Sequence, residues 1–109
     1  MVGQKEMFFE IWDERPKVCT ICYNPLGNEP NAWFFSHTIG KGAYPAFKLR
    51  KKNIDLMCAN CHHLYDHSTH VAKTIANFGW VFKKAERLKQ QYNWYIRNRL
   101  LVDSRLKHQ

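Results

Sequence analysis

The chain has 109 residues, of which 45% are hydrophobic and 15% aromatic, so it is long enough for one globular domain and too apolar for a disordered segment. Its formal net charge of +8 is high for this length. No stretch reaches the roughly 20 apolar residues of a membrane-spanning helix, and the first fourteen residues hold no apolar run of signal-peptide length, so we expect an intracellular protein with no membrane partner.

The first half of the chain alternates short regular elements with loops. Apolar residues at helical spacing predict a helix over residues 3–14, which Pro16 ends. Residues 24–30 are dense in turn formers and predict a loop, whereas the aromatic and β-branched residues 32–39 suit a strand. A second, shorter strand is predicted at residues 54–57 after an irregular segment.

The second half reads as helical. A helix is expected to begin at residue 60 or 61 and run to about 67, with a further helical stretch near residues 70–78. Apolar residues at helical spacing then predict a final helix from about 80 to 101. We expect Trp80 and Trp94 on this helix to pack in the core rather than to stack on nucleic-acid bases. The expected order is a helix, two strands and then helices, and we expect an α+β fold class.

All four cysteines occur as two Cys-x-x-Cys pairs, Cys19 with Cys22 and Cys58 with Cys61. Inside a cell thiols stay reduced, so such pairs are typical of metal ligands rather than disulfides. Two tight turns of this spacing can direct four thiolates at one tetrahedral Zn²⁺, and four thiolates leave no open position for a substrate. The sequence therefore predicts a structural zinc. The 35 residues between the pairs are more than an ordinary zinc ribbon needs and predict a folded excursion.

That excursion carries Ser36-His37 and leads into the run Asn53-Ile-Asp-Leu-Met-Cys58-Ala-Asn-Cys61-His62. In order and spacing these residues resemble the HNH endonucleases, or ββα-metal nucleases, in the branch braced by two Cys-x-x-Cys pairs. The match covers residues 19–67, and Ile11-Trp-x-x-Arg15-Pro16 extends it more loosely, as in phage members. The resemblance implies one domain over residues 1–109: an N-terminal helix (1–16), a zinc-braced ββα core (17–69) and a C-terminal helical extension (70–109).

The resemblance also implies catalytic roles. His37 would be the general base that takes a proton from the attacking water, which suits an imidazole because its pKa lies near neutral pH. Asn53 would hold the loop through its amide and keep the base oriented. On the residues alone, His37 could instead be a structural histidine and Asn53 only a turn former.

The same resemblance implies a catalytic divalent ion, Mg²⁺, Mn²⁺ or another. His62 would bind it, together with Asp66 four residues later on the same helix face. His67 is the substitute ligand, since His63 and His67 are also four residues apart. Many members have Asp or His before the general base as a further ligand, and this chain has Ser36 there. Water or His67 could fill that position, or the site could be degenerate.

Basic residues suggest how nucleic acid would be held. From Arg15 onward, 16 Lys or Arg face five Asp or Glu, and such a one-sided positive field favours a polyanion. Phosphate contacts are expected from the cations between His37 and the second cysteine pair, namely Lys41, Lys48, Arg50, Lys51 and Lys52. Cations on the final helix, among them Lys84 and Arg87, either contact DNA or form a solvated face.

We therefore expect a metal-dependent DNA endonuclease that hydrolyses phosphodiester bonds. The alternative is a zinc-stabilised DNA-binding accessory factor with weak or no cleavage, and a protein-interaction domain is the third hypothesis. Resemblance to phage members suggests a phage or prophage protein in a bacterial cytoplasm. A monomer and a homodimer are both compatible with the sequence.

Overall fold

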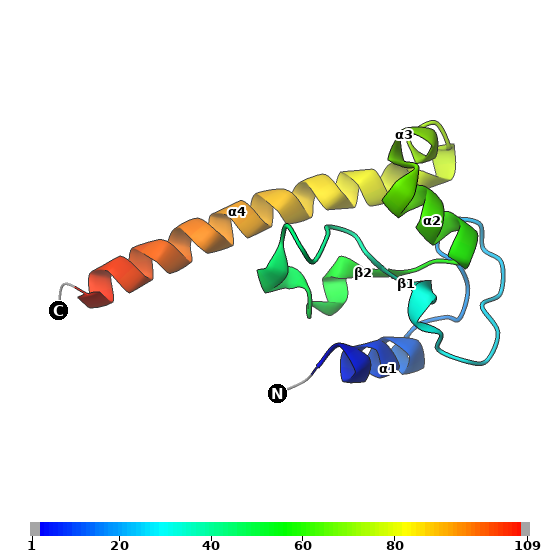
Figure 1. Ribbon diagram of the computed structural model, residues 1–109, viewed down its shortest axis with the longest axis horizontal. Helices are drawn as coiled ribbons and strands as arrows, with labels where there is room; N and C mark the ends of the chain where they lie inside the picture. The colour runs from blue at the N-terminus through cyan, green and yellow to red at the C-terminus, as the bar shows by residue number, and fades with distance from the viewer. Residues whose placement is uncertain (1–2, 108–109) are drawn as a thin grey trace.

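Figure 1 shows the computed structural model, which describes the backbone of residues 3–107 and the side chains of residues 3–99. The described residues form a small α+β fold with four α-helices and one two-stranded antiparallel sheet, so the expected fold class is confirmed. The elements are α1 (Gln4–Glu14), β1 (Phe35–His37), β2 (Ile54–Leu56), α2 (Ala59–His67), α3 (Thr69–Ala72) and α4 (Gly79–Lys107). Short 3-10 turns occupy Ala32–Phe34, Pro45–Phe47, Lys51–Asn53 and Ala76–Phe78.

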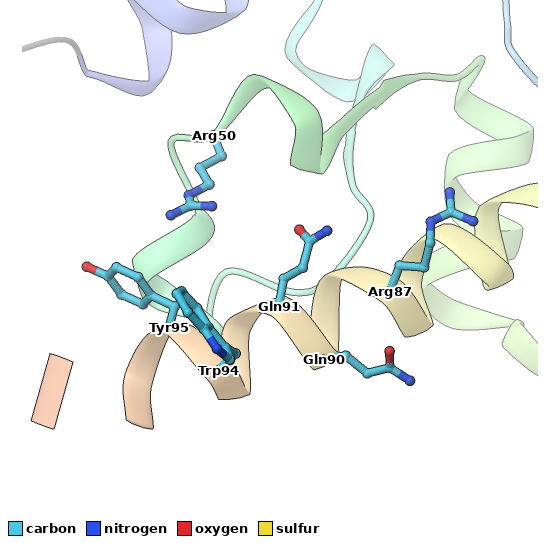
Figure 2. A pocket seen from close by; sticks show the side chains of 6 residues that line it. All are labelled: Arg50, Arg87, Gln90, Gln91, Trp94 and Tyr95. Atoms are coloured by element: carbon cyan, nitrogen blue, oxygen red, sulfur yellow. The ribbon is translucent and has the colours of Figure 1, made fainter. Parts of the chain in front are cut away.

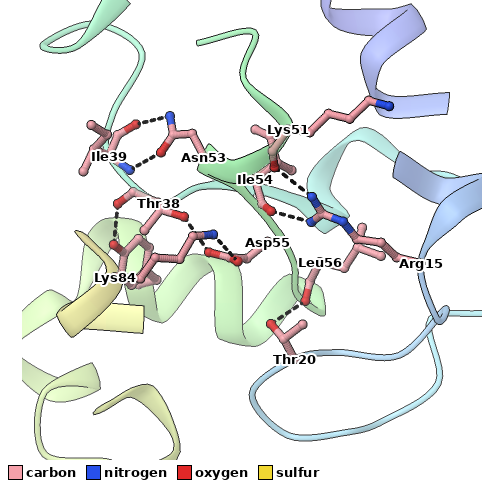
Figure 3. A network of polar contacts seen from close by, with 11 residues as sticks. Arg15, Thr20, Thr38, Ile39, Lys51, Asn53, Ile54, Asp55, Leu56 and Lys84 are labelled. Carbon is pink, nitrogen blue, oxygen red and sulfur yellow. Dashed lines mark hydrogen bonds and ion pairs between the residues drawn. The ribbon is translucent and has the colours of Figure 1, made fainter. Parts of the chain in front are cut away.

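The helix α1 covers the hairpin with one apolar face. Met7, Ile11 and Trp12 recur at helical spacing, and all three side chains are buried. Directly after α1, the Arg15 guanidinium donates hydrogen bonds to the carbonyl oxygens of Ile54 and Lys51, as Figure 3 shows. The N-terminal helix is therefore tied by polar contacts to the start of β2 as well as packed on the sheet.

The first strand is shorter than the eight residues predicted. Residues 32–34 form a 3-10 turn, in which Phe34 N donates to Asn31 O, so pairing starts only at Phe35 opposite Leu56. The ladder ends after His37 because the backbone N–H of Ile39 donates to the Asn53 side chain instead of to a strand. Aromatic and β-branched composition thus overestimated the strand, since tertiary hydrogen bonds decide its limits.

The helix α4 joins two apolar clusters. Near its start, Phe78 and Val81 belong to the main core with the hairpin, α1 and α2. Further along, Ala85 and Leu88 pack with Ile39 and Phe47 of the excursion. Beyond these contacts the helix continues past the body of the molecule (Figure 1).

Three expectations about the C-terminal half are wrong. The helical stretch predicted at residues 70–78 is only the four-residue α3 and a 3-10 turn, and α4 runs further than residue 101. Trp80 and Trp94, expected in the core, are 40% and 65% exposed, because the buried face of α4 is built from its smaller apolar residues. No described helix combines enough length and apolarity to cross a lipid bilayer.

Candidate metal centre and the adjoining histidine cavity

The four cysteines come together from two turns that lie far apart in sequence, as predicted. Their sulfur atoms all lie within 4.8 Å of one another. The Cys22 and Cys58 sulfurs are 3.7 Å apart, close to the roughly 3.8 Å that a tetrahedral site with about 2.3 Å Zn–S bonds requires. Among the described residues this is the only group of three or more Cys, His, Asp or Glu ligands able to hold one ion. The chain therefore has a tetrathiol site that can bind a metal ion.

Backbone contacts hold both turns in place. The N–H and the hydroxyl of Thr20 both donate to the Leu56 carbonyl, at 2.9 and 2.8 Å, so the first turn is fixed to the end of β2. Tyr23 adopts a left-handed conformation with φ of 65°, which lets the chain turn back after Cys22. Cys58 caps the N-terminus of α2 and accepts a hydrogen bond from the backbone N–H of Cys61.

The electrostatics of the thiols favour a bound cation. Burial would raise the pKa of Cys19, but hydrogen bonds from backbone N–H groups outweigh burial and lower it to about 7. Burial and the neighbouring thiols raise the pKa of Cys61. Four thiolates this close repel one another, and a divalent cation removes that repulsion and keeps all four deprotonated.

His62, the residue after Cys61, belongs to a separate site. A cavity of about 600 Å³ lies between α1, the segment around β1, and α2. Its walls include Phe8, Trp33, His37, His62 and Asp66. Lys41 also lines it. The structure thus brings His37, His62 and Asp66 to one cavity, although they come from different elements.

His62 and Asp66 form a pair on one face of α2. His62 Nε2 lies 2.9 Å from Asp66 Oδ2, and His62 Nδ1 lies 2.5 Å from the Trp33 carbonyl oxygen. A carbonyl only accepts, so Nδ1 carries the hydrogen and the lone pair of the neutral ring is on Nε2, toward Asp66. The hydrogen bond with Asp66 raises the pKa of His62 against the opposing effect of burial. A ring fixed by a carbonyl on one nitrogen and directed at a carboxylate with the other has the arrangement of a metal-binding histidine.

His37, the last residue of β1, lines the same cavity. Its Nε2 lies 3.1 Å from the Lys48 carbonyl oxygen and therefore donates, which leaves Nδ1 of the neutral ring free to accept a proton. Burial lowers the pKa of His37 below its ordinary value, and the positive charge of Lys41 acts in the same direction. Both effects favour the neutral form of the ring.

Asn53 is fully buried next to this histidine. Its Oδ1 accepts from Ile39 N at 2.8 Å, and its Nδ2 donates to the carbonyl oxygens of Ile39 and Phe47. Its own carbonyl accepts from Thr38 N at 2.8 Å. The residue therefore organises the backbone that directly follows His37.

Two residues considered as ion ligands lie elsewhere. The Ser36 side chain is fully buried, and its hydroxyl has no hydrogen-bond partner, so it does not reach the cavity. His67 lies on another face of α2, with its ring centroid 5.0 Å from that of His63. Neither residue lines the cavity beside His62 and Asp66.

The five cations expected to contact phosphate do not form one surface. Lys41 lines the histidine cavity, whereas the Arg50 guanidinium stacks 3.9 Å from the centre of the Phe47 ring. Lys51 is paired with Glu10 and Glu14 of α1. Lys52 lines a different cavity, next to Arg87, and the contribution of Lys48 near the histidine is its carbonyl oxygen.

The hairpin is bonded to α2 and α4 by a polar network, part of which Figure 3 draws. Sequence reasoning assigned no role to its members Thr38, Asp55 and Tyr65. Lys84, expected on a DNA-contacting or solvated face, is instead paired with the buried Asp55. Asp55, which is 5% exposed, accepts from the Thr38 hydroxyl at 2.6 Å and from Lys84 of α4 at 2.7 Å. The Tyr65 hydroxyl of α2 donates to the Thr38 carbonyl at 2.5 Å. Thr38, the residue after His37, is thus bonded to β2 through Asp55 and to α2 through Tyr65, and Asp55 is in turn bonded to α4. An acid inside a buried strand was the available signal, because such a group needs a partner.

Comparison with known proteins finds no matching family model, no similar curated protein and no similar solved structure. The tetrathiol site can hold an ion, and the cavity beside it contains His37, whose pKa is lowered, and the His62–Asp66 pair. Such a cavity can combine proton transfer with cation binding.

Proposed function

We propose that the protein is a metal-dependent endonuclease that hydrolyses phosphodiester bonds in DNA, built on a zinc-stabilised ββα-metal core of the HNH type. The observation that carries the proposal is the shared cavity of His37, His62 and Asp66 directly after the tetrathiol site. The order of base, buried Asn53, cysteine pair and histidine in the sequence supports the same function.

In this mechanism His37 accepts a proton from the water that attacks phosphorus. Its Nδ1 receives the proton, because Nε2–H donates to the Lys48 carbonyl oxygen. The lowered pKa of His37 keeps the ring ready to act as a base near neutral pH. Asn53 positions the base by holding the backbone at Ile39, two residues after it.

His62 and Asp66 would hold the catalytic Mg²⁺ or Mn²⁺, with water in the remaining positions. A divalent ion bound there would neutralise the charge that develops on the phosphate and the leaving oxygen. His62 Nε2 and Asp66 Oδ2, which lie 2.9 Å apart, are the two atoms that would bind the ion. The donor set, one imidazole and one carboxylate, suits a divalent ion of this class.

DNA is the proposed substrate because of the charge of the chain. A net charge of +8 attracts a polyanion, and Lys41 brings one cation to the rim of the catalytic cavity. For the tetrathiol site we propose Zn²⁺, since its spacing fits the tetrahedral geometry that four thiolates give this ion.

Plasmid cleavage tests the proposal. The purified full chain, with zinc content measured, is incubated with supercoiled plasmid and Mg²⁺ or Mn²⁺ beside two variants. His37→Ala should lose about 100-fold or more of the rate, because the proton acceptor is gone. His70→Ala is the matched control, since His70 is exposed on α3 and lines no part of the cavity. Equal rates in all three samples would point to a contaminating nuclease and refute the proposal.

A second candidate function is a zinc-stabilised DNA-binding factor that does not cleave. It is favoured by one observation: apart from His37, the proposed base, His62 and Asp66 are the only described imidazole and carboxylate groups that line the cavity, because Ser36 is buried and His67 lies elsewhere. Binding of plasmid or duplex DNA without nicking under any divalent ion would select this function over the nuclease.

A further inference from the structure

A second cavity lies against the exposed part of α4, away from the histidines. It has a volume of about 550 Å³, within the range of small-ligand pockets. Figure 2 shows its lining: Arg87, Gln90, Gln91, Trp94 and Tyr95 come from α4, and Arg50 reaches toward them from the excursion. The α4 residues that share a cavity with His37 are different ones, Glu86 and Lys89 among them.

The lining combines an aromatic platform with cations. The Trp94 side chain is 65% exposed, the highest exposure of any described tryptophan. The Arg50 guanidinium lies 3.9 Å from the centre of the Phe47 ring and 5.5 Å from that of Tyr95, so its position is fixed by aromatic contacts. None of the ion pairs among the described residues involves Arg50 or Arg87.

The indole, guanidinium and amide groups of this lining are of the types that contact nucleotides in proteins. An exposed indole can stack on a base, and a guanidinium can bind the adjoining phosphate. The amides of Gln90 and Gln91 offer both donors and acceptors to a base edge. No acidic side chain lines the described part of this cavity, so its charge suits an anion.

The site continues toward further cations. Arg87 and Gln91 also line a neighbouring cavity of about 420 Å³, where Lys52 and Arg15 are found. The Arg15 guanidinium donates to two backbone carbonyls. Lys84 and Asp55 also line this cavity, but they are paired with each other, so Lys52 and Arg87 are the described cations left to contact phosphates there. A strand could therefore follow one side of α4 from Trp94 to Lys52.

We propose that this surface of α4, Arg50 and Lys52 binds an unpaired DNA strand, with one base stacked on Trp94. We take DNA as the polyanion from the proposed function, but the surface does not share its residues with the histidine cavity. An unpaired strand fits better than a duplex, because paired bases keep their faces stacked inside the helix and unavailable to an indole. The occupant is thus a single-stranded segment beside the duplex to be cut.

Fluorescence anisotropy with a labelled oligodeoxythymidine of about 12 nucleotides tests this, using the full zinc-loaded chain at about 50 mM salt without added Mg²⁺. Trp94→Ala should weaken binding about ten-fold or more, Trp94→Phe should retain most of the affinity, and Arg87→Gln should weaken it and reduce its salt dependence. Trp80→Ala is the matched control, because Trp80 is also exposed on α4 but lies outside this cavity.

Three results would overturn the proposal. The first is that Trp94→Ala binds the oligonucleotide as tightly as the parent does. The second is that Trp94→Ala loses as much affinity for a duplex of the same length as for the single strand. The third is that sedimentation shows a different oligomeric state for Trp94→Ala, which would identify Trp94 as a contact between two copies. Failure of the nuclease proposal looks different: plasmid remains uncut while the oligonucleotide still binds through Trp94. The converse result is plasmid cleavage that depends on His37, with oligonucleotide binding that does not depend on Trp94. That result would refute the proposed single-strand surface and leave the nuclease proposal intact.

Discussion

The side chain of Asn53 binds both main-chain groups of Ile39. Its carbonyl oxygen accepts from Ile39 N at 2.8 Å, and its amide nitrogen donates to Ile39 O at 3.0 Å. The amide thus takes the place of a neighbouring strand, and it does so where the chain leaves the sheet after His37. The pairing is completely buried, so neither residue can exchange the contact for water.

We expect Asn53→Ala to lower the free energy of unfolding by about 2 kcal/mol or more, because it leaves the N–H and C=O of Ile39 unpaired in the interior. Chemical denaturation of the zinc-loaded protein measures the change. Asn93→Ala, at an exposed position on α4, is the control and should stay within about 0.5 kcal/mol of the parent. If Asn53→Ala had the same free energy of unfolding as Asn93→Ala, the hydrogen bonds between Asn53 and Ile39 would not stabilise the fold.

Removal of the proposed zinc should unfold the protein. Metal binding in small zinc domains supplies on the order of 10 kcal/mol of folding free energy, comparable with the whole stability of a domain of this size. Metal analysis should find one zinc per chain, and circular dichroism after chelation should show loss of cooperative melting. Cys22→Ser should have the same effect without a chelator. A metal-free sample that melts cooperatively at the original temperature would rule out a structural role for the ion.

Because Asp55 and Lys84 are in contact, we expect the single variant Lys84→Met to lose much more stability than the double variant that removes both charges. Lys84→Met should destabilise the fold by about 3 kcal/mol, since it leaves a buried carboxylate without its cation. The double variant Asp55→Leu, Lys84→Met removes both charges and should recover a large part of that loss. A double-mutant cycle based on chemical denaturation measures the coupling. Additive effects would mean that the 2.7 Å contact contributes nothing specific.

Ser36→Ala should leave the protein as stable as the parent or up to about 1 kcal/mol more stable, because the buried hydroxyl has no hydrogen bond to lose. Ser36→Asp should do the reverse. It places a carboxylate in the interior directly opposite Asp55 on the paired strand, and like charges across a ladder repel. Thermal melts of both variants decide the point. Strong destabilisation by Ser36→Ala would show that the hydroxyl has a partner.

The tetrathiol site and the α+β class were predictable, since both depend on patterns that are local in sequence. Each Cys-x-x-Cys pair defines its own turn, and the apolar spacing around Val81 and Leu88 defines a helix. The hairpin was predictable in kind but not in length, because Asn53 ends the first strand by a side-chain contact 14 residues away. A composition-based prediction contains no information on such a contact.

The remaining features depend on which surfaces the tertiary structure leaves uncovered. The orientation of His62 rests on a backbone carbonyl, that of Trp33, and any residue type would supply one. Trp94 is exposed because the residues between the two cysteine pairs do not cover this part of α4. Helical spacing alone is equally compatible with a buried tryptophan at this position. Geometry of this kind appears only once the chain is folded.

The position of Cys61 next to His62 restricts where the chain can change its length. One peptide bond separates the tetrathiol site from the histidine cavity, and α2 is attached to Thr38 through Tyr65. A residue inserted between Cys61 and His62 would rotate His62 and Asp66 together by about 100° around the helix axis relative to the tetrathiol site, and one inserted between His62 and Asp66 would rotate these two side chains apart by the same angle. Within the turn-rich loop, Asn24 and Leu26 are hydrogen-bonded to Cys19 and Lys17 beside the first cysteine turn, whereas residues 27–29 are exposed. Insertions and fusion tags therefore belong at residues 27–29, where the two sites keep their separation.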